Sequence, residues 1–131
     1  MEEFSPETGP SPESRGSVEA LAVLAAELGF IETVELHDLR LTVLQALQTD
    51  AAAGREAMAT YQAAAEVHVQ AQDSRSAANV GYRVTVGAMW LEAGEVDLGL
   101  DELWETGYQA GQTPGIESLR EALESFVEEY E

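Results

Sequence analysis

The chain has 131 residues, of which 25 are acidic and six are basic, and its net charge is -19. All six basic residues are arginine, and the sequence contains neither lysine nor cysteine. So negative a chain repels nucleic-acid phosphates and anionic membranes, and it lacks the residues needed for Schiff-base, phosphate-loop or thiol chemistry.

The first 16 residues differ in composition from the rest of the chain. They are acidic, rich in serine and hold three of the four prolines, which predicts a disordered tail over residues 1–16. They lack the basic start and apolar stretch of a secretory signal, and no apolar run reaches the roughly 20 residues that span a bilayer. Residues 17–131 have the length and apolar content of a single domain. Because cysteine is absent, we expect a cytoplasmic protein.

Apolar residues at helical spacing predict three helices in the first half of this domain. The first follows Ser17, a good N-cap, and ends at Gly29. The second begins near Thr33, and the third covers about residues 52–71. Their apolar stripes are Leu21, Leu24, Ala25 and Leu28, then Leu36, Leu39, Val43, Ala46 and Leu47, then Met58, Tyr61, Ala64, Ala65 and His68.

Three more helices are predicted in the second half. The fourth runs to about Glu92, before Gly94, and its N-cap candidates are Asp73, Ser74 and Ser76. The sixth opens at Thr113-Pro114, because proline is favoured in the first turn of a helix. The stripes of the fifth and sixth helices are Val96, Leu100, Leu103, Trp104 and Tyr108, and Ile116, Leu119, Leu123, Phe126, Val127 and Tyr130.

Two short segments, residues 30–34 and 82–86, carry β-branched residues in near alternation, which is typical of strands. We expect both to be helical, because their flanks are rich in alanine and two short strands cannot form a stable sheet. The sequence therefore predicts an all-α protein of about six helices. Short connections predict that consecutive helices pack antiparallel, as helical hairpins or a bundle.

The segment from Gly54 to Tyr130 repeats the order helix, turn, helix, turn. Six residues stand where a repeat of two helices would place its turns and its packing residues: Asp73, Gly94, Gly99, Leu103, Trp104 and Pro114. The Trp-x-x-Leu-Gly sequence that usually starts such a repeat is absent. The segment resembles the longer-period tetratricopeptide-type repeats of bacterial adapters and regulators. Two registers are open: Tyr61 matches Trp104 at a period of 43, or Tyr108 at a period of 47. The resemblance implies an α-solenoid fragment whose concave face binds a peptide or a helix.

Candidate catalytic and metal-binding residues are few. His37 and His68 fall outside the Glu-x-x-His and His-x-x-x-His spacings of di-iron and single-helix zinc sites. The densest acidic cluster lacks the pattern of a calcium-binding loop. We interpret it as a solvated helix face, with a site for a basic partner or a divalent cation as alternatives; its members are Glu92, Glu95, Asp97, Asp101, Glu102 and Glu105. We expect no enzyme activity, no resident metal and no cofactor.

The segment between Tyr82 and Tyr108 combines both tryptophans with acidic residues and helix-interior glycines, for which we favour close helix packing. Large aromatics can anchor a partner, and neighbouring carboxylates favour a partner that carries Arg or Lys at the rim. In the competing interpretation, the tryptophans are core residues between the fourth and fifth helices. The expected partner-binding residues are Tyr82, Trp90, Asp101, Glu102, Trp104, Glu105 and Tyr108.

These observations predict a non-catalytic adapter or chaperone-like module that binds a peptide or helix of another protein with a basic or amphipathic segment. One alternative is an acidic mimic of nucleic acid that occupies a DNA-binding protein, and its binding would fade steeply with salt. Another is a self-associating helical domain, with the aromatic residues buried in a homodimer. A composition shared by the whole proteome of the source would also account for the acidity.

Overall fold

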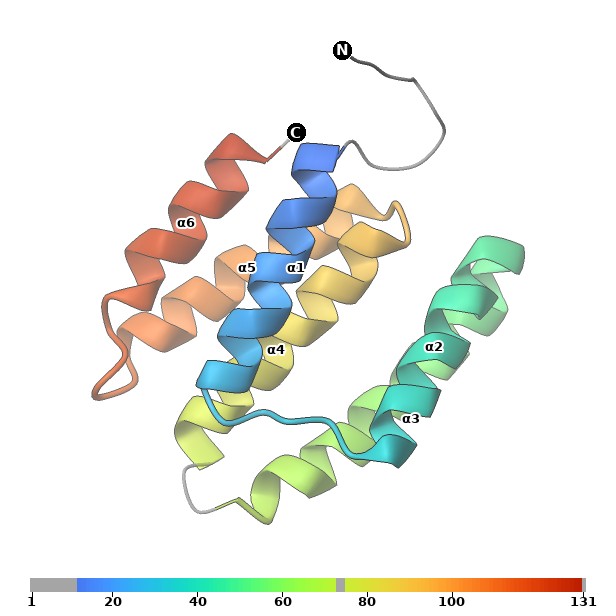
Figure 1. Cartoon of the computed structure of the whole chain (residues 1–131), viewed down its shortest axis with the longest axis horizontal. Helices are drawn as coiled ribbons and strands as arrows, with labels where there is room; N and C mark the ends of the chain where they lie inside the picture. The colour runs from blue at the N-terminus through green and yellow to red at the C-terminus, as the bar shows by residue number, and fades with distance from the viewer. Residues whose placement is uncertain (1–11, 73–74, 131) are drawn as a thin grey trace.

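The computed structural model describes residues 12–72 and 75–130, with side chains for residues 18–72 and 76–130. Over these ranges the protein is all-α and contains no strand, which confirms the predicted fold class. The helices are α1 (Pro12–Glu27), α2 (Val34–Thr49), α3 (Ala51–Gln70), α4 (Arg75–Glu92), α5 (Val96–Gly111) and α6 (Leu119–Glu129), as Figure 1 shows. None of the helices described is long and apolar enough to cross a membrane.

Capping side chains and glycines set several helix ends where the sequence predicts them. The Thr33 hydroxyl accepts a hydrogen bond of 3.1 Å from the Leu36 N–H and so begins α2. Asp50 separates α2 from α3 and caps α3 with its carboxylate. Gly29 and Gly94 follow α1 and α4 with φ angles of 98° and 88°, in the left-handed region that glycine enters most easily.

Two predicted helix starts are wrong. The first helix begins at Pro12, within the predicted tail, and not after Ser17; residues 1–11 of that tail lie outside the described residues. The sixth helix begins at Leu119 and not at Thr113-Pro114. Gly115 has a φ angle of 93°, which interrupts the helix that proline would otherwise start.

The remaining differences concern two connections. Residues 30–33 are extended and not helical: Phe30 is buried and Ile31 exposed, so the alternation in this segment reflects an extended backbone. The fourth helix begins at Arg75, which places the predicted N-cap Ser76 inside it. The other two N-cap candidates, Asp73 and Ser74, lie outside the described residues.

The central element of the fold is α4, which is buried on two sides. One side packs with α2 and α3 through Ala78, Tyr82, Val86 and Met89. The other side packs with α1 and α5 through Val80, Val84, Ala88 and Leu91, in a core that α6 completes by packing on α5. Burial on both sides explains why residues 82–86 lack a one-sided helical pattern, and their predicted helical state is confirmed.

Neighbouring helices pack in hairpins, with one exception. As predicted, α2 packs on α3, α4 on α5 and α5 on α6 (Figure 1). The prediction is wrong for α1, because in the described part of the chain α1 packs on α4 and makes no contact with α2. The extended connection of residues 30–33 carries the chain from α1 to the far side of α4.

Glycines allow the closest helix contacts, as the sequence suggests. A Cβ atom added at Gly81 of α4 would lie 2.8 Å from the carbonyl oxygen of Ala25 in α1. A Cβ atom added at Gly99 of α5 would lie 3.0 Å from the carbonyl oxygen of Gly87 in α4. The backbones of these helices therefore approach each other as closely as glycine permits.

Candidate functional site

The structure divides the predicted binding residues between two sides of the protein. Tyr82 is only 5% exposed and packs on Phe30 in the core, with ring centroids 5.8 Å apart. Trp90 is partly buried against the same core. The Tyr82 ring therefore does not form the wall of a groove, which corrects its place in the predicted site.

Trp104 and Tyr108, by contrast, lie together on the outer face of α5. Their exposed fractions are 45% and 53%, and one helical turn separates them. They line a shallow depression of about 360 Å³ that we call the α5 surface. Its residues are Arg83, Trp104, Glu105, Tyr108, Gln109 and Gln112.

Arg83 of α4 forms the base of the α5 surface and fixes α5 in place. Its Nε donates a hydrogen bond of 2.9 Å to the Glu102 carboxylate, and its Nη1 donates one of 2.6 Å to the Gln109 side chain. Its Nη2 lies 3.6 Å from Glu105 Oε1. Glu102 is thus the structural partner of Arg83, while the Glu105 side chain is 72% exposed. Asp101 is also exposed, one turn before Glu105.

Apolar side chains extend the α5 surface along the helix. Val96, Leu100, Trp104 and Tyr108 follow one another at intervals of four residues, so they share one side of α5. Val96 is exposed and Leu100 is half-buried against the core. The Arg120 guanidinium of α6 lies 5.4 Å from the centre of the Tyr108 ring, a cation–π distance. This contact orients the ring at one end of the surface.

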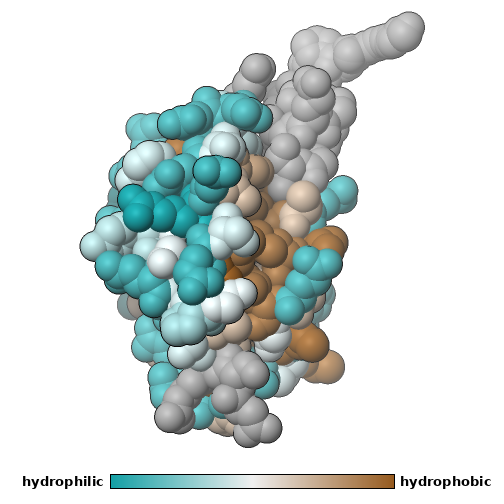
Figure 2. All heavy atoms as spheres, turned by 90° about the vertical axis from the view of Figure 1, so that its left-hand side faces the viewer, coloured by the Kyte–Doolittle hydropathy of each residue, from teal (hydrophilic) through white to brown (hydrophobic). Residues whose placement is uncertain are grey.

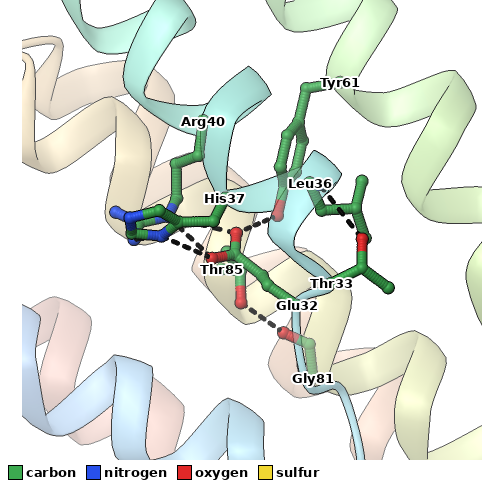
Figure 3. Close-up of polar contacts among 8 residues, drawn as sticks. All are labelled: Glu32, Thr33, Leu36, His37, Arg40, Tyr61, Gly81 and Thr85. Carbon is green, nitrogen blue, oxygen red and sulfur yellow. Dashed lines mark hydrogen bonds and ion pairs between the residues drawn. The ribbon is translucent and has the colours of Figure 1, made fainter.

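A second polar cluster lies where the connection after α1 meets α2 and α3 (Figure 3). The Glu32 carboxylate, in the connection after α1, accepts hydrogen bonds of 3.1 Å from Arg40 Nε and 2.7 Å from the Tyr61 hydroxyl. Arg40 also donates a hydrogen bond of 3.0 Å to His37 Nδ1, which accepts it because arginine can only donate. The cluster therefore joins the connection, α2 and α3.

The tyrosines in the core have shifted acidities. Burial raises the pKa of Tyr61 far above its usual range, and its hydrogen bond to Glu32 raises it further. Burial also raises the pKa of Tyr82, to which the negative charges of Glu66 and Glu102 add. Both hydroxyls thus stay protonated at neutral pH and act as hydrogen-bond donors.

The two histidines have structural contacts. His37 is exposed beside Arg40, and His68 Nε2 lies 2.9 Å from the carbonyl oxygen of Ile31. His68 also meets the Phe30 ring edge-on, with ring centroids 6.1 Å apart. In residues 12–72 and 75–130, no three histidine or acidic side chains converge as a metal site requires.

Sequence reasoning placed Trp104, Glu105 and Tyr108 in one site, and the structure brings these three together. It missed Arg83 and Gln109, because only the packing of α4 on α5 brings them to the same depression. It also missed the Glu32 cluster; the one unusual signal there was the near alternation of β-branched residues over residues 30–34. Comparison with protein-family models, curated proteins and solved structures finds no match for this chain.

Proposed function

We propose that this protein is a non-catalytic interaction module whose α5 surface binds a short segment of another protein. The observation that carries the proposal is the pair Trp104 and Tyr108, two large aromatics half-exposed one turn apart beside a depression. Exposed aromatic clusters of this kind supply most of the binding energy in many protein interfaces. The depression offers room for one or two side chains of a partner.

The charge around the α5 surface selects the partner. Glu105 and Asp101 border the aromatic pair, and the whole chain carries a net charge of -19. Since like charges repel and opposite charges speed association, a segment with Arg or Lys next to an apolar residue fits best. Arg83, which pairs with Glu102, places a positive charge at the base of the depression. Since like charges repel, a basic group of the partner would lie at the rim and not at the base.

Hydrogen bonds hold the base of the α5 surface in place. Arg83 is held by Glu102 and Gln109, so the base of the depression is ordered before a partner arrives. Ordered side chains lose little conformational entropy on binding. A partner therefore meets a preformed site.

A peptide-display selection tests the proposal. Wild-type protein in about 0.5 M NaCl, where exposed charges are screened, is used to select random peptides, which are then titrated against variants. We expect the selected peptides to pair a basic residue with an apolar one. Trp104→Ala should weaken their binding by about tenfold or more. The matched control is Leu41→Ala, which truncates an equally exposed apolar side chain on α2.

Charge reversal, titrated at low salt where exposed charges are not screened, gives a second, independent measurement. Asp101→Lys should weaken binding, whereas Glu128→Lys changes the net charge equally on an exposed position of α6 and should not. Glu102 is unsuitable for reversal because it pairs with Arg83 in the folded state. If Trp104→Ala leaves the affinity unchanged and added salt abolishes binding, the proposal is contradicted and the nucleic-acid mimic is favoured. A homodimer that dissociates on Trp104→Ala would favour self-association.

A further inference from the structure

A groove of about 340 Å³ runs along α1 on the side that faces α2, with α4 as its floor; residues 30–32 of the connection and Arg40 of α2 complete its lining. It exists because α1 and α2 both pack near α4 without touching each other in the described part of the chain. One face of α1 and one face of α4 line it over about two turns each. These faces include Val18, Ala22 and Ala26 from α1 and Thr85, Met89 and Glu92 from α4.

The helix that walls this groove is apolar on its outward sides. Between Val18 and Leu28, only Glu19 and Glu27 are charged, and Val23 is 59% exposed. Figure 2, which views the molecule from the side of α6 and away from the groove, shows apolar surface at the edge where α1 lies, next to the hydrophilic surface of α6. A surface helix normally turns a polar face to water. An apolar helix face at the surface therefore indicates that a partner covers it.

The two ends of the groove differ in charge. Since α1 and α4 run antiparallel (Figure 1), Glu19 in the middle of α1 and Glu92 at the end of α4 border the same end of the groove. At the other end lie Glu32 and Arg40, which neutralise each other at 3.1 Å. The groove is thus an apolar trough with two carboxylates at one mouth.

We propose that this groove binds an amphipathic helix of another protein. Apolar side chains spaced three and four residues apart on that helix would enter the trough, whose length is that of about two helical turns. Lys or Arg residues at one end of the helix would meet Glu19 and Glu92. A second copy of this chain is a poor occupant, because it brings a further net charge of -19 to the same mouth.

The groove is a site of its own and does not depend on the α5 surface. Thr85 lines the groove and Arg83 lines the α5 surface, and they lie two residues apart on α4. Two residues correspond to about 200° around a helix, so the two sites face opposite sides of α4. One molecule can therefore hold two partners at once, as an adapter would.

The test uses a fluorescein-labelled Leu/Lys amphipathic peptide of about 15 residues, long enough to form a helix. Its affinity is measured by fluorescence anisotropy in about 0.5 M NaCl, so that purely electrostatic binding is suppressed. The blocking variant is Ala22→Trp, which fills the groove from an exposed position on α1. The matched control is Ala20→Trp, two residues away on the opposite side of the same helix. Circular dichroism confirms that both variants fold.

We expect Ala22→Trp to weaken peptide binding by about tenfold or more and Ala20→Trp to stay within about twofold of wild type. Because a Leu/Lys peptide also fits the α5 surface, both α1 variants are compared in the background of the double variant Trp104→Ala with Tyr108→Ala, where binding to the groove should persist. Equal effects of the two α1 variants would overturn the proposal. So would loss of binding in the α5 double variant. Sedimentation velocity that finds a dimer, dissociated by Ala22→Trp, would overturn it in favour of a second copy.

Discussion

The Tyr61 hydroxyl donates a hydrogen bond of 2.7 Å to the Glu32 carboxylate, 29 residues earlier in the chain. Tyr61 is fully buried in α3, and Glu32 lies in the connection that leads from α1 to α2. Arg40 holds the same carboxylate from α2. Together these two contacts hold the connection against α2 and α3.

Replacing Tyr61 with phenylalanine removes the hydrogen bond and keeps the ring. We expect Tyr61→Phe to lower the free energy of unfolding by about 1–3 kcal/mol, because the acceptor is a charged and mostly buried group. Urea denaturation followed by circular dichroism measures the change. The control is Tyr108→Phe on the exposed face of α5, which should stay within about 0.5 kcal/mol of wild type. Equal stability of the two variants would mean that the bond to Glu32 contributes little.

The raised pKa of Tyr61 and Tyr82 predicts that the fold weakens at alkaline pH. In the unfolded chain a tyrosine ionises near pH 10, whereas in the folded protein both hydroxyls stay protonated above that pH. Below about pH 10 their contribution to stability is complete, and as pH rises further the unfolded state gains by losing protons. Each such tyrosine lowers the free energy of unfolding by about 1.4 kcal/mol per pH unit in that range.

Denaturation at several pH values between 8 and 11, roughly the range around the tyrosine pKa, measures this slope. Tyr61→Phe should have a shallower fall above pH 10, because one of the two tyrosines with raised pKa is gone. An identical slope in Tyr61→Phe and wild type would show that Tyr61 ionises alike in both states.

The contact between Gly81 and α1 predicts a cost for adding a single methyl group. A Cβ atom at residue 81 would lie 2.8 Å from the Ala25 carbonyl oxygen, a backbone atom that cannot swing away. Overpacking of this kind costs about 1–3 kcal/mol, more than the roughly 1 kcal/mol that alanine gains over glycine in a helix. We expect Gly81→Ala to destabilise the protein in thermal or urea unfolding.

Gly111→Ala is the matched control, because its added Cβ would meet the flexible side chain of Arg120 at 2.8 Å. That side chain is exposed and can move, so we expect no loss of stability. If Gly81→Ala were as stable as Gly111→Ala, α1 would be free to shift on α4. The groove between α1 and α2 would then be adjustable in width.

The fold class and most helix positions could be predicted because local signals agree with the packing there. The stripe from Leu119 to Tyr130 is one-sided since α6 packs on one side only, whereas α4 shows no stripe because both of its sides are buried. An extended segment and a helix buried on two sides can both carry apolar and β-branched residues in near alternation, without a one-sided helical stripe. This is why residues 30–34 and 82–86 look alike, and only the second is helical throughout.

The candidate site was harder to predict than the fold. Trp90 and Trp104 each lie in a predicted helix on either side of Gly94. In the structure, Trp90 is packed against the core and Trp104 is half-exposed. Which side of a helix faces outward depends on the neighbours that cover it, and α1 packs on α4 where a simple hairpin would place it on α2. The groove between α1 and α2 exists because α1 packs on α4 instead of on α2. Local sequence patterns do not predict which helices pack together, so they do not predict the groove.

Leu103 and Trp104 offer the sharpest test of the two interpretations of the tryptophans. Leu103 is fully buried where α5 packs on α4, so Leu103→Ala should lower the free energy of unfolding by about 2–5 kcal/mol. Trp104 is 45% exposed, and Trp104→Ala should change the same quantity by less than about 1 kcal/mol. Urea denaturation of both variants, side by side, makes the comparison. A loss at Trp104 as large as that at Leu103 would place the indole in the core and remove the anchor of the α5 surface. A small loss together with weakened peptide binding would assign Trp104 to recognition, since a residue that the fold does not need is then needed by the partner.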